Sequence, residues 1–134
     1  MKLAIKFVAA TCIALPALLM PVLAQQGAFR TVPSKRTTLG TMDFPPGYQT
    51  VMGISEIAPG TCVGRHTHPG ISMPYVLEGE TVLKVDGKPD QHVKAGDAIQ
   101  MEAGVPHDDC TTTGVKQLTV HVIEKGKPLS SPAP

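Results

Sequence analysis

The chain has 134 residues with 12 basic and 11 acidic side chains and no tryptophan, so its formal net charge is only +1. A length of this order accommodates one domain. Because it has no run of basic residues and few, scattered aromatic residues, the chain offers neither an electrostatic footprint for nucleic acid nor a platform on which bases could stack.

The first 24 residues have the composition of a secretory signal peptide. Two lysines precede an apolar run at residues 7–23, which ends in Ala24 and is followed by two glutamines. This order of charged, apolar and small residues is typical of a leader that is removed after Ala24. Pro16 and Pro21 interrupt the run, which disfavours a transmembrane anchor, because an anchor needs about 20 apolar residues. We therefore expect a periplasmic or secreted protein with no membrane attachment after cleavage.

The remainder divides into an arm, a β-rich domain and a tail. Residues 25–49 are rich in proline, threonine and glycine and predict an extended N-terminal arm, whereas residues 125–134 form a low-complexity tail that we expect to be disordered. Between them, residues 50–124 alternate short apolar segments with turn residues, among them the hairpin signal Asp86-Gly87. Apolar residues never recur there at helical spacing for three turns. The pattern predicts an all-β barrel or sandwich.

Three histidines in this domain are candidate metal ligands. His66 and His68 are two residues apart, so on a strand both side chains face the same side. His107 follows a Gly-Val-Pro turn at the expected start of another strand. Three neutral imidazoles suit a divalent transition metal such as Fe, Zn, Mn, Ni or Cu. A pair of surface histidines is the alternative for His66 and His68 alone.

The spacing around these histidines resembles the cupin superfamily, in particular small single-domain type-2 cupins of the quercetin-dioxygenase-like kind. The positions that carry the resemblance are Gly60, His66, His68 and Gly79 of the first cupin motif and Gly96, Gly104 and His107 of the second. The resemblance implies a jelly-roll β-barrel over residues 50–124, metal ligation by the three histidines, and a homodimer.

Three positions depart from the family's pattern. Ser72 stands where the family has a ligating glutamate, while Glu102 and Thr111 replace a proline and an asparagine of the second motif. If strand alternation holds, Ser72 faces the cavity, and the site has three histidines with no anionic protein ligand. Some cupin dioxygenases use such a three-His iron site, so this departure is compatible with catalysis.

Two functions and one structural role are compatible with the resemblance. One is a three-His metal-dependent dioxygenase or related enzyme that acts on a small organic molecule, with no catalytic side chain assigned. The other is a non-catalytic module that binds a metal or a small ligand, and a purely structural role for the histidines is a third reading. The barrel alone does not decide, because one fold hosts many activities.

The remaining polar residues carry weaker expectations. His92 is expected at the surface, and His121 is expected to be a strand-face residue rather than a ligand. One of the two aspartates after His107, Asp108 or Asp109, could face the cavity beside the ligands, and exposure to solvent is the equal alternative. Spacing alone slightly favours two buried thiols at Cys62 and Cys110, but the resemblance places the two motif strands side by side, which makes a disulfide the testable alternative.

Overall fold

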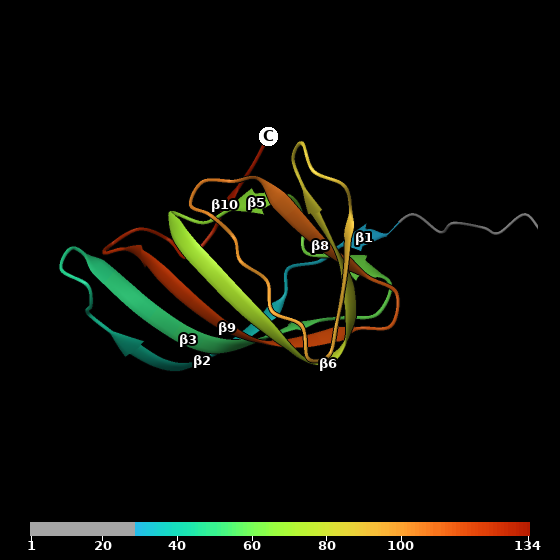
Figure 1. Ribbon diagram of the computed structural model, residues 1–134, viewed down its shortest axis with the longest axis horizontal. Helices are drawn as coiled ribbons and strands as arrows, with labels where there is room; N and C mark the ends of the chain where they lie inside the picture. The colour runs from blue at the N-terminus through green and yellow to red at the C-terminus, as the bar shows by residue number, and fades with distance from the viewer. Residues whose placement is uncertain (1–28) are drawn as a thin grey trace, which may run out of the picture.

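The computed structural model describes residues 29–134, and the expected signal peptide, residues 1–24, lies outside them. This part of the chain folds entirely as strands and turns, which confirms the all-β prediction (Figure 1). None of the described residues belongs to a helix that could cross a membrane. The strands are β1 (Arg30–Thr31), β2 (Lys35–Met42), β3 (Tyr48–Ile57), β4 (Thr61–Cys62), β5 (His66–Thr67), β6 (Gly70–Val85), β7 (Gln91–Lys94), β8 (His107–Thr111), β9 (Val115–Glu124) and β10 (Ser131–Pro132).

The long strand β6 is where the sheet curls. Its first part, from Gly70 to Gly79, pairs with β9, and its second part pairs with β7 and β8. Gly79 lies at the junction with a φ of 76°, and a Cβ atom there would collide with the carbonyl oxygen of Gly114. Only glycine tolerates both conditions, so Gly79 allows the strand to bend. The order β1-β4-β8-β6-β9-β3-β2 thereby curls into a half-barrel (Figure 1).

Side-chain alternation gives the curled sheet an inner and an outer face. Along β9 every second residue from Val115 to Ile123 is buried, and the intervening residues are partly exposed. An apolar cluster packs inside the curl, formed by Ile57, Val76, Leu83, Val85, Val93, Ile99, Met101 and Val115. This cluster supports the strands that carry the polar site described below.

The expected N-terminal arm contributes a full strand to the sheet. β2 pairs antiparallel with β3 from Lys35 opposite Glu56 to Met42 opposite Thr50, with a register shift between Thr38 and Gly40. The sequence predicted that the barrel starts at residue 50, but the sheet already includes β2, which precedes that residue.

The C-terminal tail is ordered against β5, which corrects the expectation of disorder. Ser131 and Pro132 pair with Thr67 and His66, and the Ala133 amide donates to the Arg65 carbonyl at 3.0 Å. Strand pairing uses backbone groups, which every residue except proline carries in full, so a low-complexity composition does not prevent it.

Candidate metal centre

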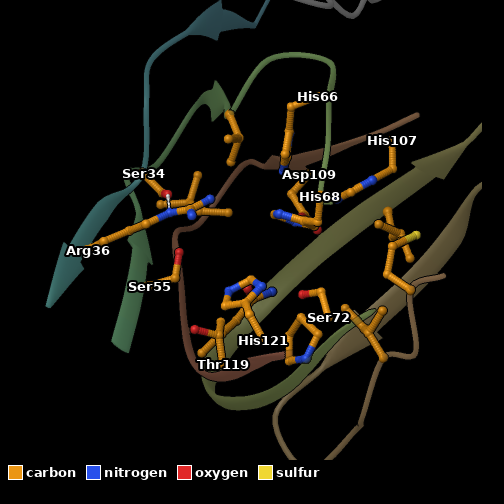
Figure 2. Close-up of a pocket in the computed structure, with 17 residues that line it drawn as sticks. Ser34, Arg36, Ser55, His66, His68, Ser72, His107, Asp109, Thr119 and His121 are labelled. Carbon is orange, nitrogen blue, oxygen red and sulfur yellow. Dashed lines mark hydrogen bonds between the residues drawn. The ribbon is translucent and has the colours of Figure 1, made fainter. Parts of the chain in front are cut away.

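Two neighbouring strands bring the three predicted histidines together. His66 lies on β5 and His68 directly follows it, while His107 begins β8 and pairs with His66 across the two strands. All three are buried, with between 4 and 8% of their surface exposed. Their rings converge on the same cavity (Figure 2).

The separations among the three rings suit a shared metal ion. Ring centroids are 5.0 Å apart for His66 and His68, 4.3 Å for His66 and His107, and 5.1 Å for His68 and His107. One ring nitrogen from each lies within 4.8 Å of the others. Ligand nitrogens around tetrahedral zinc lie about 3.4 Å apart, so a bound ion requires only a small inward movement of the rings.

Each of the three imidazoles has its outward nitrogen held by a backbone carbonyl. His66 Nδ1 lies 2.8 Å from the Gly64 oxygen, His68 Nδ1 lies 2.8 Å from the Leu129 oxygen, and His107 Nδ1 lies 2.9 Å from the Val105 oxygen. A carbonyl only accepts, so each Nδ1 carries the hydrogen and each Nε2 keeps its lone pair. This is the arrangement of metal-binding histidines, whose other nitrogen almost always donates to a fixed acceptor.

Burial keeps the three imidazoles neutral. It lowers the pKa of His66 and His107 below the ordinary value and that of His68 to about 3, and hydrogen bonds to backbone carbonyls only partly oppose this. Neutral imidazole is the form that ligates a metal, so no proton has to be displaced at pH 7. The donor set therefore fits one divalent transition metal ion.

Ser72 and His121 face each other inside the same cavity. They are paired residues of β6 and β9, and their exposed fractions are 2 and 3%. Ser72 thus occupies the inward position expected from strand alternation (Figure 2). His121 lies beside His68 with ring centroids 4.8 Å apart, so it is part of the cavity wall, although it is outside the group of three that can share an ion.

The two aspartates after His107 have separate roles. The Asp108 carboxylate accepts a hydrogen bond of 2.9 Å from the Gly64 amide, which fixes the turn before His66. Asp109 is buried and lines the cavity. Burial, together with the nearby charge of Asp108, raises the pKa of Asp109 to about 7. One of the pair therefore does face the site, as the sequence allowed, whereas His92 is exposed as expected.

Sequence reasoning missed Arg36, which comes from the arm. The residue as a whole is exposed, but its side chain extends from β2 toward the histidines, and its Nε donates to Ser34 Oγ at 3.2 Å (Figure 2). Burial lowers the pKa of its guanidinium and the Asp109 charge opposes this, but arginine remains cationic at pH 7. No local pattern in the arm indicates that Arg36 approaches residues 30 or more positions away.

The cavity is small and leads to a larger groove. Its volume is about 30 Å³, which is room for an ion with one or two water-sized groups. The groove, of about 680 Å³, lies between the arm and the C-terminal tail. Cavity and groove share Ser34, Arg36, Val63 and His66, so these residues form the mouth of the site.

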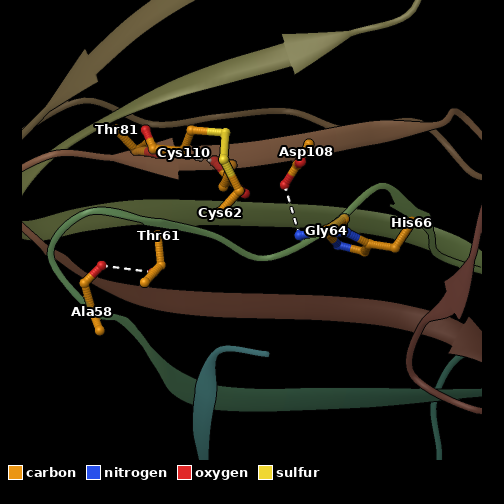
Figure 3. Close-up of a disulfide and its surroundings, with 9 residues drawn as sticks. Ala58, Thr61, Cys62, Gly64, His66, Thr81, Asp108 and Cys110 are labelled. Carbon is orange, nitrogen blue, oxygen red and sulfur yellow. Dashed lines mark hydrogen bonds between the residues drawn. A yellow bond between two sulfur atoms is a disulfide. The ribbon is translucent and has the colours of Figure 1, made fainter. Parts of the chain in front are cut away.

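A disulfide joins β8, which begins with His107, to β4, the strand that precedes His66 in the chain. Cys62 on β4 and Cys110 on β8 are directly paired, with Cα atoms 4.0 Å apart, and their sulfurs are bonded (Figure 3). The slight preference for free thiols was therefore wrong, because the antiparallel register of β4 and β8 places the two cysteines opposite each other. Cys62, Cys110 and Asp108 are also close enough to form a second group of potential metal ligands. The disulfide bond uses both sulfurs of that group.

Comparisons with known proteins agree with this geometry. Residues 53–124, just over half of the chain, match the family model described as Cupin domain. The HTH-type transcriptional regulators PuuR of Escherichia coli (strain K12) and Shigella flexneri are each 36% identical to the chain over 69 residues. The match spans 51% of this chain but only 37% of the regulators.

Solved structures share the fold at low identity. An uncharacterized conserved protein with a double-stranded β-helix domain from Klebsiella pneumoniae has a TM-score of 0.63 at 18% identity, covering 80% of this chain and 91% of that one. DMSP lyase DddQ from Ruegeria pomeroyi has a TM-score of 0.64 at 17% identity, covering 75 and 52%. A cupin superfamily protein from Desulfitobacterium hafniense has a TM-score of 0.60 at 19% identity, covering 71 and 82%. The family model, the curled all-strand fold and the two histidine strands lead to one conclusion: the chain belongs to the cupin family.

Proposed function

We propose that this protein binds one divalent transition metal ion through the Nε2 atoms of His66, His68 and His107. The observation that carries the proposal is the set of three carbonyl acceptors, one on each Nδ1. They fix three neutral imidazoles with their lone pairs directed inward, which is the state a metal site requires. Fe, Zn, Mn, Ni and Cu remain the candidate ions.

The metal centre serves a small metal-dependent oxygenase or related enzyme that acts on a small organic molecule outside the cytoplasm. A redox-active ion would supply the electron transfer of oxygenase chemistry. The chain's own residues keep the imidazoles neutral, limit the space beside them to a cavity of about 30 Å³, and leave the Ser72 side without an anionic ligand. A fold neighbour that is named as a lyase supports an enzymatic role for this architecture.

Metal analysis of the purified protein tests the ion. Protein produced from the full sequence and recovered from the extracytoplasmic fraction should begin at Gln25 by N-terminal sequencing and contain about one metal ion per chain. His66→Ala, His68→Ala and His107→Ala should each lose most of the metal, because each removes one of three donors. His92→Ala is the matched control, since His92 is exposed and lies outside the cavity. Equal metal content in all four variants would contradict the assignment.

Oxygen consumption tests the enzyme class. Iron-loaded protein is screened with small organic molecules in an oxygen electrode, and His107→Ala is run alongside as the matched blank. Uptake by the wild-type protein alone supports an oxygenase. Tight metal binding without turnover of any compound favours the alternative function, a non-catalytic metal- or ligand-binding module.

One observation favours that alternative. The curated relatives are transcriptional regulators, and the matched segment is about a third of their length, as a ligand-binding module attached to a separate DNA-binding part would be. A binding module would show a saturable ligand response with no chemical change in the ligand.

A second copy of the chain is the proposed protein partner. Met52, Ile71, Met73 and Tyr75 on the outer face of β3 and β6 are between 41 and 45% exposed, and half-exposed apolar residues of β9 lie between them. A continuous apolar sheet face of this kind commonly marks an interface. Light scattering should give the mass of a homodimer, and Met73→Lys should give a monomer.

A further inference from the structure

The floor of the cavity contains two buried polar atoms without a partner. Gln117 and His121 lie on the inner face of β9 and are 2 and 3% exposed. Within residues 29–134, neither Gln117 Nε2 nor His121 Nδ1 has a hydrogen-bond partner. Leaving one such group unpaired costs about 1–3 kcal/mol, so two of them in one cavity indicate that a polar ligand completes their hydrogen bonding.

The mouth of the cavity supplies a cation that forms no salt bridge within residues 29–134, although the buried Asp109 in the same cavity is near enough to act on its pKa. Arg36 takes part in none of the salt bridges of the described chain, whereas its neighbour Lys35 is paired with Glu56 at 3.0 Å. Among the residues that the structure describes, the one side-chain hydrogen bond of Arg36 runs from Nε to Ser34 Oγ, which leaves the terminal nitrogens of the fork available for a ligand. A guanidinium fork matches a carboxylate better than any neutral group.

The two volumes set the size of that ligand. Beside a metal ion the cavity accepts only a head group the size of one or two waters, such as the two oxygens of a carboxylate. The groove of about 680 Å³ outside it can hold a small organic remainder. Arg36 lines both spaces, so a head group that it binds stays next to the three imidazoles while its tail lies in the groove.

We propose that the site is built for a small organic carboxylate, whose carboxylate group is bound by Arg36 at the mouth and receives a hydrogen bond from Gln117 on the floor. The inference rests on the proposed metal centre, because the carboxylate sits beside the ion that the three histidines hold. It names the chemical class of the substrate or ligand, which the fold leaves open.

Titration of the cobalt-loaded protein tests the inference. Co²⁺ is added first, and its visible spectrum reports on the centre without any turnover. Propionate is then compared with propionamide, which has nearly the same shape and no charge. Propionate should perturb the cobalt spectrum in a saturable way, and propionamide should bind at least about 10-fold more weakly, since hydrogen bonds to charged groups are worth more than neutral ones.

Variants locate the effect. Arg36→Gln should weaken propionate binding about 30-fold and Gln117→Leu about 10-fold, with cobalt affinity changed less than threefold. Lys35→Gln is the matched control on the same strand and should bind propionate like the wild-type protein. Arg36→Lys should restore part of the affinity, because it keeps the charge and loses the fork.

The outcomes separate the two proposals. Cobalt binding with equal affinity for propionate and propionamide, or with no spectral response to either, overturns the carboxylate inference and leaves the metal centre intact. Failure of the wild-type protein to bind cobalt overturns both. If Arg36→Gln does not fold, the wild-type comparison and the Gln117→Leu variant decide the question.

Discussion

Removal of the C-terminal tail should weaken metal binding mainly through His68. A stop codon after Pro128 deletes the Leu129 carbonyl, which lies 2.8 Å from His68 Nδ1, together with the β10 pairing to β5. His66 and His107 keep their acceptors, because Gly64 and Val105 are only two residues away in the sequence.

The expected magnitude follows from the role of that carbonyl. Loss of a partner that orients a metal-bound histidine lowers metal affinity by about 10- to 100-fold. The tail also lines the groove, so water reaches the freed nitrogen after truncation and replaces part of the lost hydrogen bond. We therefore expect the lower end, about 10-fold, which equals about 1.4 kcal/mol.

Competition with a chromophoric chelator measures the zinc affinity of both forms at one pH. A protein that ends at Ala133 is the matched control, because it keeps β10 and the Ala133 hydrogen bond to Arg65. Imidazole ¹⁵N spectra of the zinc-loaded proteins should show a larger change for His68 than for His66 and His107, which keep their carbonyl acceptors. Equal zinc affinity and an unchanged His68 signal after the longer truncation would refute the reasoning.

Three further predictions concern the same centre. Ser72→Glu adds a carboxylate to the cavity wall and should raise Mn²⁺ affinity more than Cu²⁺ affinity in calorimetric titrations. If a folded variant binds Mn²⁺ no more tightly than the wild-type protein, residue 72 does not face the metal. Replacing Cys62 and Cys110 by serine opens a loop with a sequence separation of 48 and should lower the free energy of unfolding in urea by up to about 4 kcal/mol, whereas wild-type stability unaffected by reductant would argue against the bridge. In the metal-free protein the pKa of His68 is about 3 when folded and ordinarily 6.5, so unfolding takes up protons and stability should fall as the pH drops below 6.5 toward 4. Asp109 acts in the opposite direction, because its folded pKa of about 7 exceeds the ordinary 3.8. Asp109→Asn should therefore make the loss of stability at low pH steeper. A stability independent of pH in this window would contradict the burial of the histidines.

Local patterns in the sequence were sufficient for the fold class and for the three histidines. Alternating apolar residues and Asp-Gly or Pro-Gly turns predict strands without any long-range information. The two-residue spacing of His66 and His68 places both on one face, and the same alternation places Ser72 inward, because side-chain direction in a strand depends only on the parity of the position.

Tertiary structure decided what surrounds those histidines. Along β9 the apolar residues Leu118, Val120 and Val122 face outward, while Gln117 and His121 face the cavity, which reverses the usual assignment of an apolar inner face. Alternation shows that two faces exist, but the strands packed on either side determine which face is enclosed.

The most distant contributions were the hardest to predict. Arg36 reaches the site from β2, and the Leu129 carbonyl holds His68 across 61 positions in the sequence. The pairing of Cys62 with Cys110 likewise depends on the register of β4 and β8. Such contacts depend on which backbone segments become neighbours in the folded chain, and backbone groups are nearly the same in every residue, so their pairing leaves no signature in the local sequence.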